Sequence, residues 1–262
     1  MNYLLTGGHT GIGLELTNVL LKEGHKIGLI VRTEKRKQET LQALAKPEMV
    51  DFFFADLSQA DAVQAVAKDI NEKWERIDGL FNNAGLLAGE ANYSARGNEM
   101  QLEINALAPY DLTKALLPLL NKADKPFVMN TATGNLHKQK KKETSELKRP
   151  KKFVKLLGSY LNSKFAMAMM MNFLAQNNPQ LRVASVDPGP NQTNMTKSSG
   201  MPAWLKPFSK ILFAQPIKGA MKIYRAAFDP KFQGQSGIYI TGDKVKALKA
   251  SYNDVEIAEL LA

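Results

Sequence analysis

Short apolar runs alternate with amphipathic stretches through the first third of the chain. The apolar runs have the length and content of buried strands, and they fall at residues 2–5, 26–31, 49–54 and 77–82. The stretches between them carry apolar residues at helical spacing and predict helices at residues 11–23, 34–45 and 59–75. Strands that alternate with helices in this order form a parallel sheet with helices on both faces.

The same alternation continues through the rest of the chain. Strands are predicted at residues 127–130, 181–186 and 237–240, and helices at residues 98–121, 153–176 and 217–227. No linker, composition break or internal repeat divides the sequence. We therefore predict one α/β domain over residues 1–262, a Rossmann-like, doubly wound parallel sheet of about seven strands with helices on both faces.

Composition excludes several kinds of site. An apolar content of 44% is typical of a folded globular protein, and the absence of cysteine excludes disulfides, a thiol nucleophile and cysteine-bound metals. The histidines are His9, His25 and His137, and their spacing is unlike that of a metal motif, so we expect no metal site. The longest apolar run, Phe165–Met171, is far shorter than the roughly 20 residues that cross a bilayer. With no signal peptide before the first strand, a cytoplasmic location is expected.

The formal net charge of +10 is concentrated in one segment. Between His137 and Lys155 there are nine Lys and Arg residues against two Glu residues. Such a segment can attract an acidic substrate, an anionic membrane or nucleic acid. Nucleic acid is disfavoured because aromatic residues do not alternate with the lysines, and a membrane helix because residues 137–152 have almost no apolar face. We predict a solvated, partly mobile surface loop, inserted at about residues 135–152, whose partner stays open.

A glycine-rich turn follows the first predicted strand and leads into the first predicted helix. A strand, a tight turn and a helix N-terminus together bring backbone N–H groups toward a pyrophosphate. The residues expected to bind a dinucleotide here are Gly7, His9, Thr10, Gly11, Ile12 and Gly13. The spacing Gly-x-x-x-Gly-x-Gly differs from the general dinucleotide fingerprint, and alone it would be a weak signal.

The end of the second predicted strand indicates which dinucleotide is bound. A site that prefers NAD has a carboxylate here to hold the ribose 2′-hydroxyl, whereas this chain has Arg32, followed by Lys35 and Arg36. A guanidinium suits a 2′-phosphate, so NADP(H) is preferred over NAD(H). The alternative is that Arg32 is a solvated residue at the edge of a loop.

Two more loops follow predicted strands at the edge where doubly wound sheets bind ligands. Asp56 and Leu57 follow the third strand, and Asn83, Ala84 and Gly85 follow the fourth. Asp56 could accept a hydrogen bond from the adenine amine, cap the following helix, or do both.

The chain combines six motifs in a fixed order. They are Thr6-Gly-x3-Gly-x-Gly13, Asp56-Leu57, Asn82-Asn-Ala-Gly85, Asn105, Tyr160-x3-Lys164 and Pro188-Gly189. Together these motifs resemble the short-chain dehydrogenase/reductase family. The resemblance covers essentially the whole chain and is strongest to the compact single-domain branch. Its later residues, including the Ser236-Gly237-x-Tyr239 ending, are similar to the retinol-dehydrogenase-like group.

The resemblance implies a set of catalytic roles. Tyr160 is expected to act as general acid/base, and Lys164, four residues later on the same helix face, to lower the pKa of Tyr160 and hold the nicotinamide ribose. Thr133 aligns with the family's serine, and Thr131 would take that place if the register shifted by two. Asn105 matches an asparagine that holds a water, or else it is a buried amide with structural bonds.

The resemblance also implies how the site is closed. Pro188, Gly189 and Thr193 match the loop that closes on the nicotinamide and its phosphates. The stretch at about 190–213 would form a substrate lid, with apolar residues that either line a pocket or anchor the loop. These residues are Met201, Trp204, Leu205 and Phe208.

The function that follows is an NADP(H)-dependent oxidoreductase that moves hydride between nicotinamide and a small-molecule carbonyl or alcohol. The alternative is a catalytically weak NADP(H)-binding sensor or scaffold, suggested by Thr133 in place of serine. A homodimer or homotetramer is expected, because similar proteins pair along the helix of Tyr160. Met167 and Met169–Met171 on that helix are expected to serve the core and a subunit interface.

Overall fold

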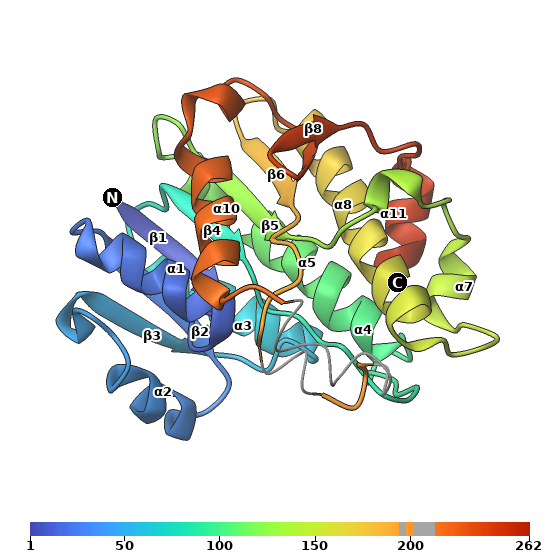
Figure 1. Cartoon of the computed structure of the whole chain (residues 1–262), viewed down its shortest axis with the longest axis horizontal. Helices are drawn as coiled ribbons and strands as arrows, with labels where there is room; N and C mark the ends of the chain where they lie inside the picture. The colour runs from blue at the N-terminus through green and yellow to red at the C-terminus, as the bar shows by residue number, and fades with distance from the viewer. Residues whose placement is uncertain (194–197, 202–212) are drawn as a thin grey trace.

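An eight-stranded sheet in the order β3-β2-β1-β4-β5-β6-β7-β8 forms the centre of the molecule (Figure 1). The structure is a computed structural model, and it describes residues 1–193, 198–201 and 213–262. Every pairing from β3 to β7 is parallel, and β8 pairs with β7 in the antiparallel direction. The strands are β1 (Asn2–Thr6), β2 (Lys26–Val31), β3 (Val50–Phe54), β4 (Gly79–Asn82), β5 (Phe127–Thr131), β6 (Arg182–Val186), β7 (Ile238–Thr241) and β8 (Lys244–Lys246).

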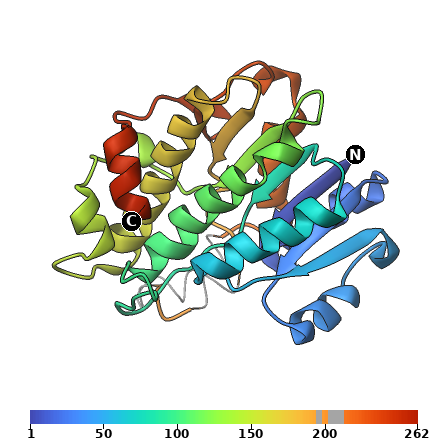
Figure 2. The same cartoon turned by 180° about the vertical axis from the view of Figure 1, so that it is seen from behind.

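Helices cover both faces of the sheet (Figures 1 and 2). On one face α1 (Gly11–Lys22) and α10 (Pro216–Phe228) pack side by side. On the other face α3 (Ala60–Lys73), α5 (Ala108–Ala115) and α8 (Leu161–Gln176) lie in sequence across the strands. The predicted doubly wound α/β architecture is confirmed, with one strand beyond the seven expected. Among the described residues, no helix has the length and apolar content to cross a membrane.

The chain order along the sheet reverses between β1 and β4, which is where doubly wound sheets bind ligands. The predicted strands agree with the structure to within about two residues. The remaining helix on the β3 side, α2 (Glu34–Leu41), ends earlier than the predicted 34–45, and its N-terminus is capped by Thr33, whose Oγ1 accepts from the Arg36 N–H at 3.3 Å.

Both long predicted helices prove to be composite. The helix expected at 98–121 consists of α4 (Met100–Leu102), a π-helical turn at Glu103–Leu107, α5 and α6 (Leu117–Leu120). The helix expected at 153–176 begins with a second π-helical turn, Lys155–Tyr160, followed by α8. Wider turns of this kind are frequent at functional sites, and these two contain Asn105 and Tyr160.

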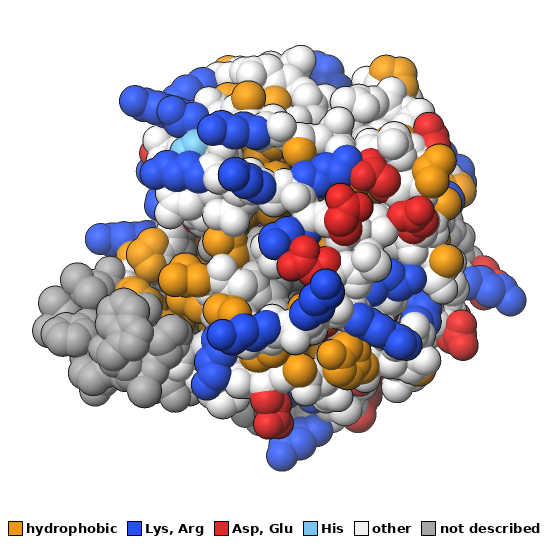
Figure 3. All heavy atoms as spheres, turned by 90° about the vertical axis from the view of Figure 1, so that its right-hand side faces the viewer, with side chains coloured by type: hydrophobic (Ala, Val, Ile, Leu, Met, Phe, Trp, Pro, Cys, Tyr) orange, Lys and Arg blue, Asp and Glu red, His pale blue; other side chains and the backbone are white. Residues whose placement is uncertain are grey.

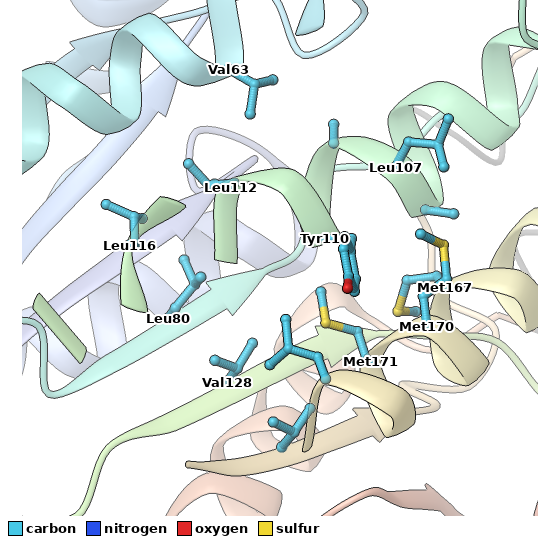
Figure 4. Close-up of a cluster of buried hydrophobic side chains, with 14 of the residues drawn as sticks. Val63, Leu80, Leu107, Tyr110, Leu112, Leu116, Val128, Met167, Met170 and Met171 are labelled. Atoms are coloured by element: carbon cyan, nitrogen blue, oxygen red, sulfur yellow. The ribbon is translucent and has the colours of Figure 1, made fainter. Parts of the chain in front are cut away.

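The methionines of α8 are part of the core. Figure 4 shows Met167, Met170 and Met171 with Tyr110, between the helices and strands β4 and β5. These three and Met169 are at most 1% exposed. These methionines were expected to serve both the core and a subunit interface, and their place in the core is confirmed. Within a single chain they are already covered and present almost no surface to a partner.

The basic segment is folded onto the C-terminus. Residues Thr144–Lys148 form a short helix, α7, which packs against α11 (Asp254–Leu261). Lys141 pairs with Glu256 at 2.5 Å, and the Thr144 hydroxyl donates to the Glu259 carboxylate at 2.6 Å. A solvated, partly mobile loop was expected here. The segment is indeed mostly exposed, and one ion pair and several hydrogen bonds connect it to residues over a hundred positions away.

Candidate active site

The glycine turn after β1 and the loop after β4 are locked together. Gly7 and Gly11 have φ values of +65° and +53°, in the left-handed region that favours glycine. Thr6 Oγ1 accepts from the backbone N–H groups of Asn83 and Ala84 at 3.1 and 3.0 Å. The Asn83 amide donates to Gly7 O at 3.1 Å. The predicted cofactor residues of both loops therefore form one surface at the edge of the sheet.

The loop after β6 lies against the same turn. A Cβ built on Gly11 would be 3.1 Å from Thr193 Cγ2, which places Thr193 directly beside the glycine turn. The loop begins with Asp187, whose carboxylate accepts from the Gly189 N–H at 2.8 Å, and Gly189 has a φ of +74°. Pro188, Gly189 and Thr193 are thus brought to the expected edge. Trp204, Leu205 and Phe208 of the predicted lid lie outside the described residues.

Positive charge surrounds the far end of the turn. Arg32, whose side chain is 67% exposed, lies 3.9 Å from the Asp56 carboxylate. Asp56 also accepts from the Ser58 N–H and hydroxyl at 3.0 and 2.7 Å, so it stabilises the turn before α3. Within the described structure His9 Nδ1 is buried without a hydrogen-bond partner. Burial, then Arg36 and Arg32, lower the pKa of His9, and Glu39 opposes them.

The structure brings Tyr160 and Thr133 together. Tyr160 ends the second π-helical turn, and the Thr133 side chain lies close enough to its hydroxyl to act on the phenol pKa, in the lowering direction. Thr131 has a different neighbour, because its hydroxyl donates to Asn83 Oδ1 at 3.1 Å. Of the two threonines considered for the serine position, Thr133 is the one beside the phenol.

The ionisation of Tyr160 differs from the expectation. Burial, with a contribution from Asp187, raises the pKa of Tyr160 to about 12, against which the Thr133 hydrogen bond acts weakly. Lys164 was expected to lower this pKa. Its ammonium instead donates to the Thr131 carbonyl at 2.7 Å, and burial lowers the pKa of Lys164 to about 8. The expected lowering of the Tyr160 pKa is therefore not found.

Asn105 makes structural bonds to the loop after β4. Its side chain accepts from the Leu86 N–H at 2.7 Å and donates to Leu86 O at 2.9 Å. It also donates to the Ser163 hydroxyl at 3.0 Å. These contacts agree with the structural interpretation and fix the distance between the loop and α8.

Apolar side chains cover the phenol of Tyr160. Leu87 and Met201 are buried against it, and Leu156 and Phe213 pack on the same cluster. Sequence reasoning included Met201 but missed Leu87 and Asp187. Asp187 follows β6 at the same sheet edge as the other site residues, and that position was the available signal.

The described residues fit a dinucleotide. At Gly13 a Cβ would lie 2.1 Å from Gly7 O, so the turn has space only for backbone, as close approach to a pyrophosphate requires. The unpartnered His9 nitrogen and the exposed Arg32 lie where the adenosine ribose is held in this fold. A doubly wound sheet with this edge belongs to the class of dinucleotide-binding α/β folds.

Comparison with known proteins identifies the family. Residues 2–145 match the family model for short chain dehydrogenases, which is more than half of the chain, and the chain belongs to this family. Polyprenol dehydrogenase of Danio rerio is 27% identical over 274 residues, covering 95% of this chain and 81% of the relative. Retinol dehydrogenase 14 of Mus musculus is 26% identical, and the match covers 98% of this chain and 82% of the relative. The predicted resemblance, including the retinol-dehydrogenase-like group, is confirmed.

Solved structures show the same fold. A short chain dehydrogenase from Salmonella enterica has a TM-score of 0.70 at 27% identity, over 91% of this chain and 94% of its own. RhlG of Pseudomonas aeruginosa, solved with NADP, has a TM-score of 0.71 at 23% identity, over 92% of this chain and 94% of its own. The chain is thus an oxidoreductase of a family that binds nicotinamide cofactors.

Proposed function

We propose that this protein is an NADP(H)-dependent reductase of a small or medium apolar carbonyl compound, with Tyr160 as the proton donor. The observation that carries the proposal is that the Tyr160 and Thr133 side chains lie together under the apolar cover of Leu87 and Met201. The cover of Leu87 and Met201 supports an apolar substrate, because a polar one would lose hydrogen bonds to water there.

Each polar residue of the site has one task. Bound NADPH supplies the hydride. Tyr160 donates its hydroxyl proton to the carbonyl oxygen, and the Thr133 hydroxyl orients that oxygen. Lys164 holds the Thr131 carbonyl at the end of β5, and its remaining N–H groups would hold the nicotinamide ribose. Asn105 keeps the loop after β4 in place through Leu86.

The preference for NADP(H) rests on the charges near His9. The β1–β2 register pairs Thr6 with Ile30, so His9 and Arg32 leave neighbouring strands at the same edge. Arg36 and Arg32 are close enough to His9 to lower its pKa. These arginines already lie beside Asp56 and Glu39, but a 2′-phosphate would add charge-assisted hydrogen bonds to them, whereas a ribose hydroxyl would gain nothing comparable.

A second candidate function is an NADP(H)-binding sensor or scaffold. The observation that favours it is the buried phenol, which has a raised pKa and an apolar cover. Such a protein would bind the cofactor tightly without reducing any carbonyl compound.

The test is NADPH oxidation with a panel of aldehydes, ketones and quinones, followed by absorbance for the wild type and Tyr160→Phe. The proposal expects turnover that falls by at least about 10²-fold in Tyr160→Phe while the Kd for NADPH stays unchanged. NADPH binding without turnover on every panel member would favour the sensor. Equal binding of NADH and NADPH would remove the argument from His9 and Arg32.

A further inference from the structure

A cleft separate from the dinucleotide site lies between the loop before α4 and helix α7. Its volume is about 540 Å³. Figure 3 views the molecule from the side of α7 and α11, where Lys and Arg side chains are numerous and acidic ones are fewer. The residues that line the cleft are Arg96, Gly97, Ser145, Glu146, Lys148, Arg149 and Lys151.

The cleft contains positive charge that no acid offsets. Its one acidic residue, Glu146, pairs with Lys142 at 3.0 Å, outside the lining. Within the described part of the chain, Lys148, Arg149 and Lys151 have no ion pair with a carboxylate. Lys148 Nζ donates to the backbone carbonyl of Glu259 at 3.0 Å, and a neutral carbonyl leaves the charge in place.

Two arginines offer donors at the same cleft. Arg149 Nε donates to Gly97 O at 3.3 Å, which leaves its terminal nitrogens for another acceptor. Its Nη2 lies 2.6 Å from the point where a Cβ of Gly97 would be, so glycine is what lets this guanidinium pack there. Arg96 binds Glu103 and Asp111, but its buried Nε has no hydrogen-bond partner among the described residues.

We propose that this cleft binds a phosphate-bearing small molecule. A phosphate monoester carries close to two negative charges and several acceptor oxygens at neutral pH, which suits three uncompensated cations better than a single carboxylate does. One guanidinium group can bind two phosphate oxygens through two parallel hydrogen bonds. The Ser145 hydroxyl, which also lines the cleft, adds a further donor. The ligand is either a free phosphate ester or the headgroup of a phospholipid, since both present the same chemistry.

The test uses inorganic pyrophosphate as probe, titrated into the whole chain by calorimetry with and without NADPH. Backbone amide resonances of Gly97 and Ser145, followed by NMR, report binding in the cleft itself. Lys151→Gln and Arg149→Gln are each expected to weaken binding roughly fivefold, and high salt to weaken it further. Lys152→Gln is the matched control, because it removes the same charge one residue outside the lining and should leave the Kd unchanged.

A second arm separates the two sources of phosphate. Sedimentation with phosphatidylcholine vesicles containing phosphatidic acid, lost in Lys151→Gln and retained in Lys152→Gln, supports the headgroup. Pyrophosphate binding with no sedimentation supports the free ester. The proposal is overturned if neither probe binds, or if both bind Lys151→Gln and Arg149→Gln as tightly as the wild type. A third outcome also overturns the proposal. If pyrophosphate binds only when NADPH is absent and does not shift the Gly97 resonance, it occupies the glycine turn after β1 and not the cleft.

Discussion

Gly13 is the point where the glycine turn and the loop after β4 come closest. A Cβ there would lie 2.1 Å from Gly7 O and 2.5 Å from Asn83 Nδ2. Both distances are far inside van der Waals contact, and one of the atoms belongs to the backbone. Gly13→Ala must therefore push the turn away from α1 and break the 3.1 Å hydrogen bond from Asn83 to Gly7.

The cost follows from these two effects. Overpacking a tight site costs about 1–3 kcal/mol, and a lost hydrogen bond costs about 1 kcal/mol. The free energy of unfolding should therefore fall by about 2–4 kcal/mol. For a chain of this size, at about 2 °C per kcal/mol, that corresponds to a melting temperature lower by roughly 4–8 °C. Because the same turn approaches the pyrophosphate, NADPH affinity should fall as well.

Urea unfolding followed by circular dichroism measures the loss, and NADPH fluorescence measures binding. Gly24→Ala is the matched control. Gly24 has a φ of +82° and no atom within 4 Å of its Cβ position, so alanine there costs only about 1–2 kcal/mol of backbone strain and should not affect NADPH. The steric reasoning is refuted if Gly13→Ala is as stable as Gly24→Ala and binds NADPH like the wild type.

Three further predictions concern polar residues of the site. Thr133→Ala should lower kcat/KM about 10²-fold at unchanged NADPH affinity while Thr133→Ser retains activity, and equal rates for Thr133→Ala and wild type would contradict this. The pKa of Lys164 is about 8 in the folded chain and 10.5 as a free side chain, so the unfolded state binds more protons between these values. The free energy of unfolding of the wild type should then rise from pH 8 to 10.5 relative to that of Lys164→Met. If urea unfolding shows the same pH dependence for both proteins, the reasoning is contradicted. Burial and the neighbouring arginines lower the pKa of His9, and a 2′-phosphate should raise it again. Calorimetry in two buffers should therefore show proton uptake with 2′,5′-ADP that disappears in His9→Asn; uptake that survives the substitution would exclude His9.

The pattern of apolar residues predicted the sheet well because its strands are buried. Strand β2 was predicted at its observed bounds, and all its residues after Lys26 are buried. Strand β8 was missed because it has three residues, all of them exposed, and so carries no apolar signal. The C-terminal helix α11 was missed although its capping box, Asn253 with Glu256, is a local signal, because only Ile257 and Leu260 on it are buried.

The π-helical turns lay beyond the reach of periodicity. The window around Asn105 keeps helical spacing, and the wider turn arises from packing against α8 and from the bonds of Asn105 to Leu86. The spacing of the motifs predicted that Tyr160, Lys164 and Thr133 belong to one site. It could not predict their ionisation, because the apolar cover that raises the pKa of Tyr160 includes Leu87 and Met201, which are far apart in sequence.

That ionisation bears on the direction of the proposed reaction. A phenol with a pKa of about 12 is almost fully protonated at neutral pH, which is the form that a proton donor needs, but it is a weaker acid than an ordinary tyrosine and so donates its proton less readily. Reduction of a carbonyl needs a donor at this position, whereas oxidation of an alcohol needs a base. Burial is the largest cause of the raised pKa, and an apolar substrate that replaces the cover of Leu87 and Met201 would preserve it. The same apolar cover therefore favours an apolar substrate and keeps Tyr160 in the protonated form that reduction requires, at the cost of its acidity.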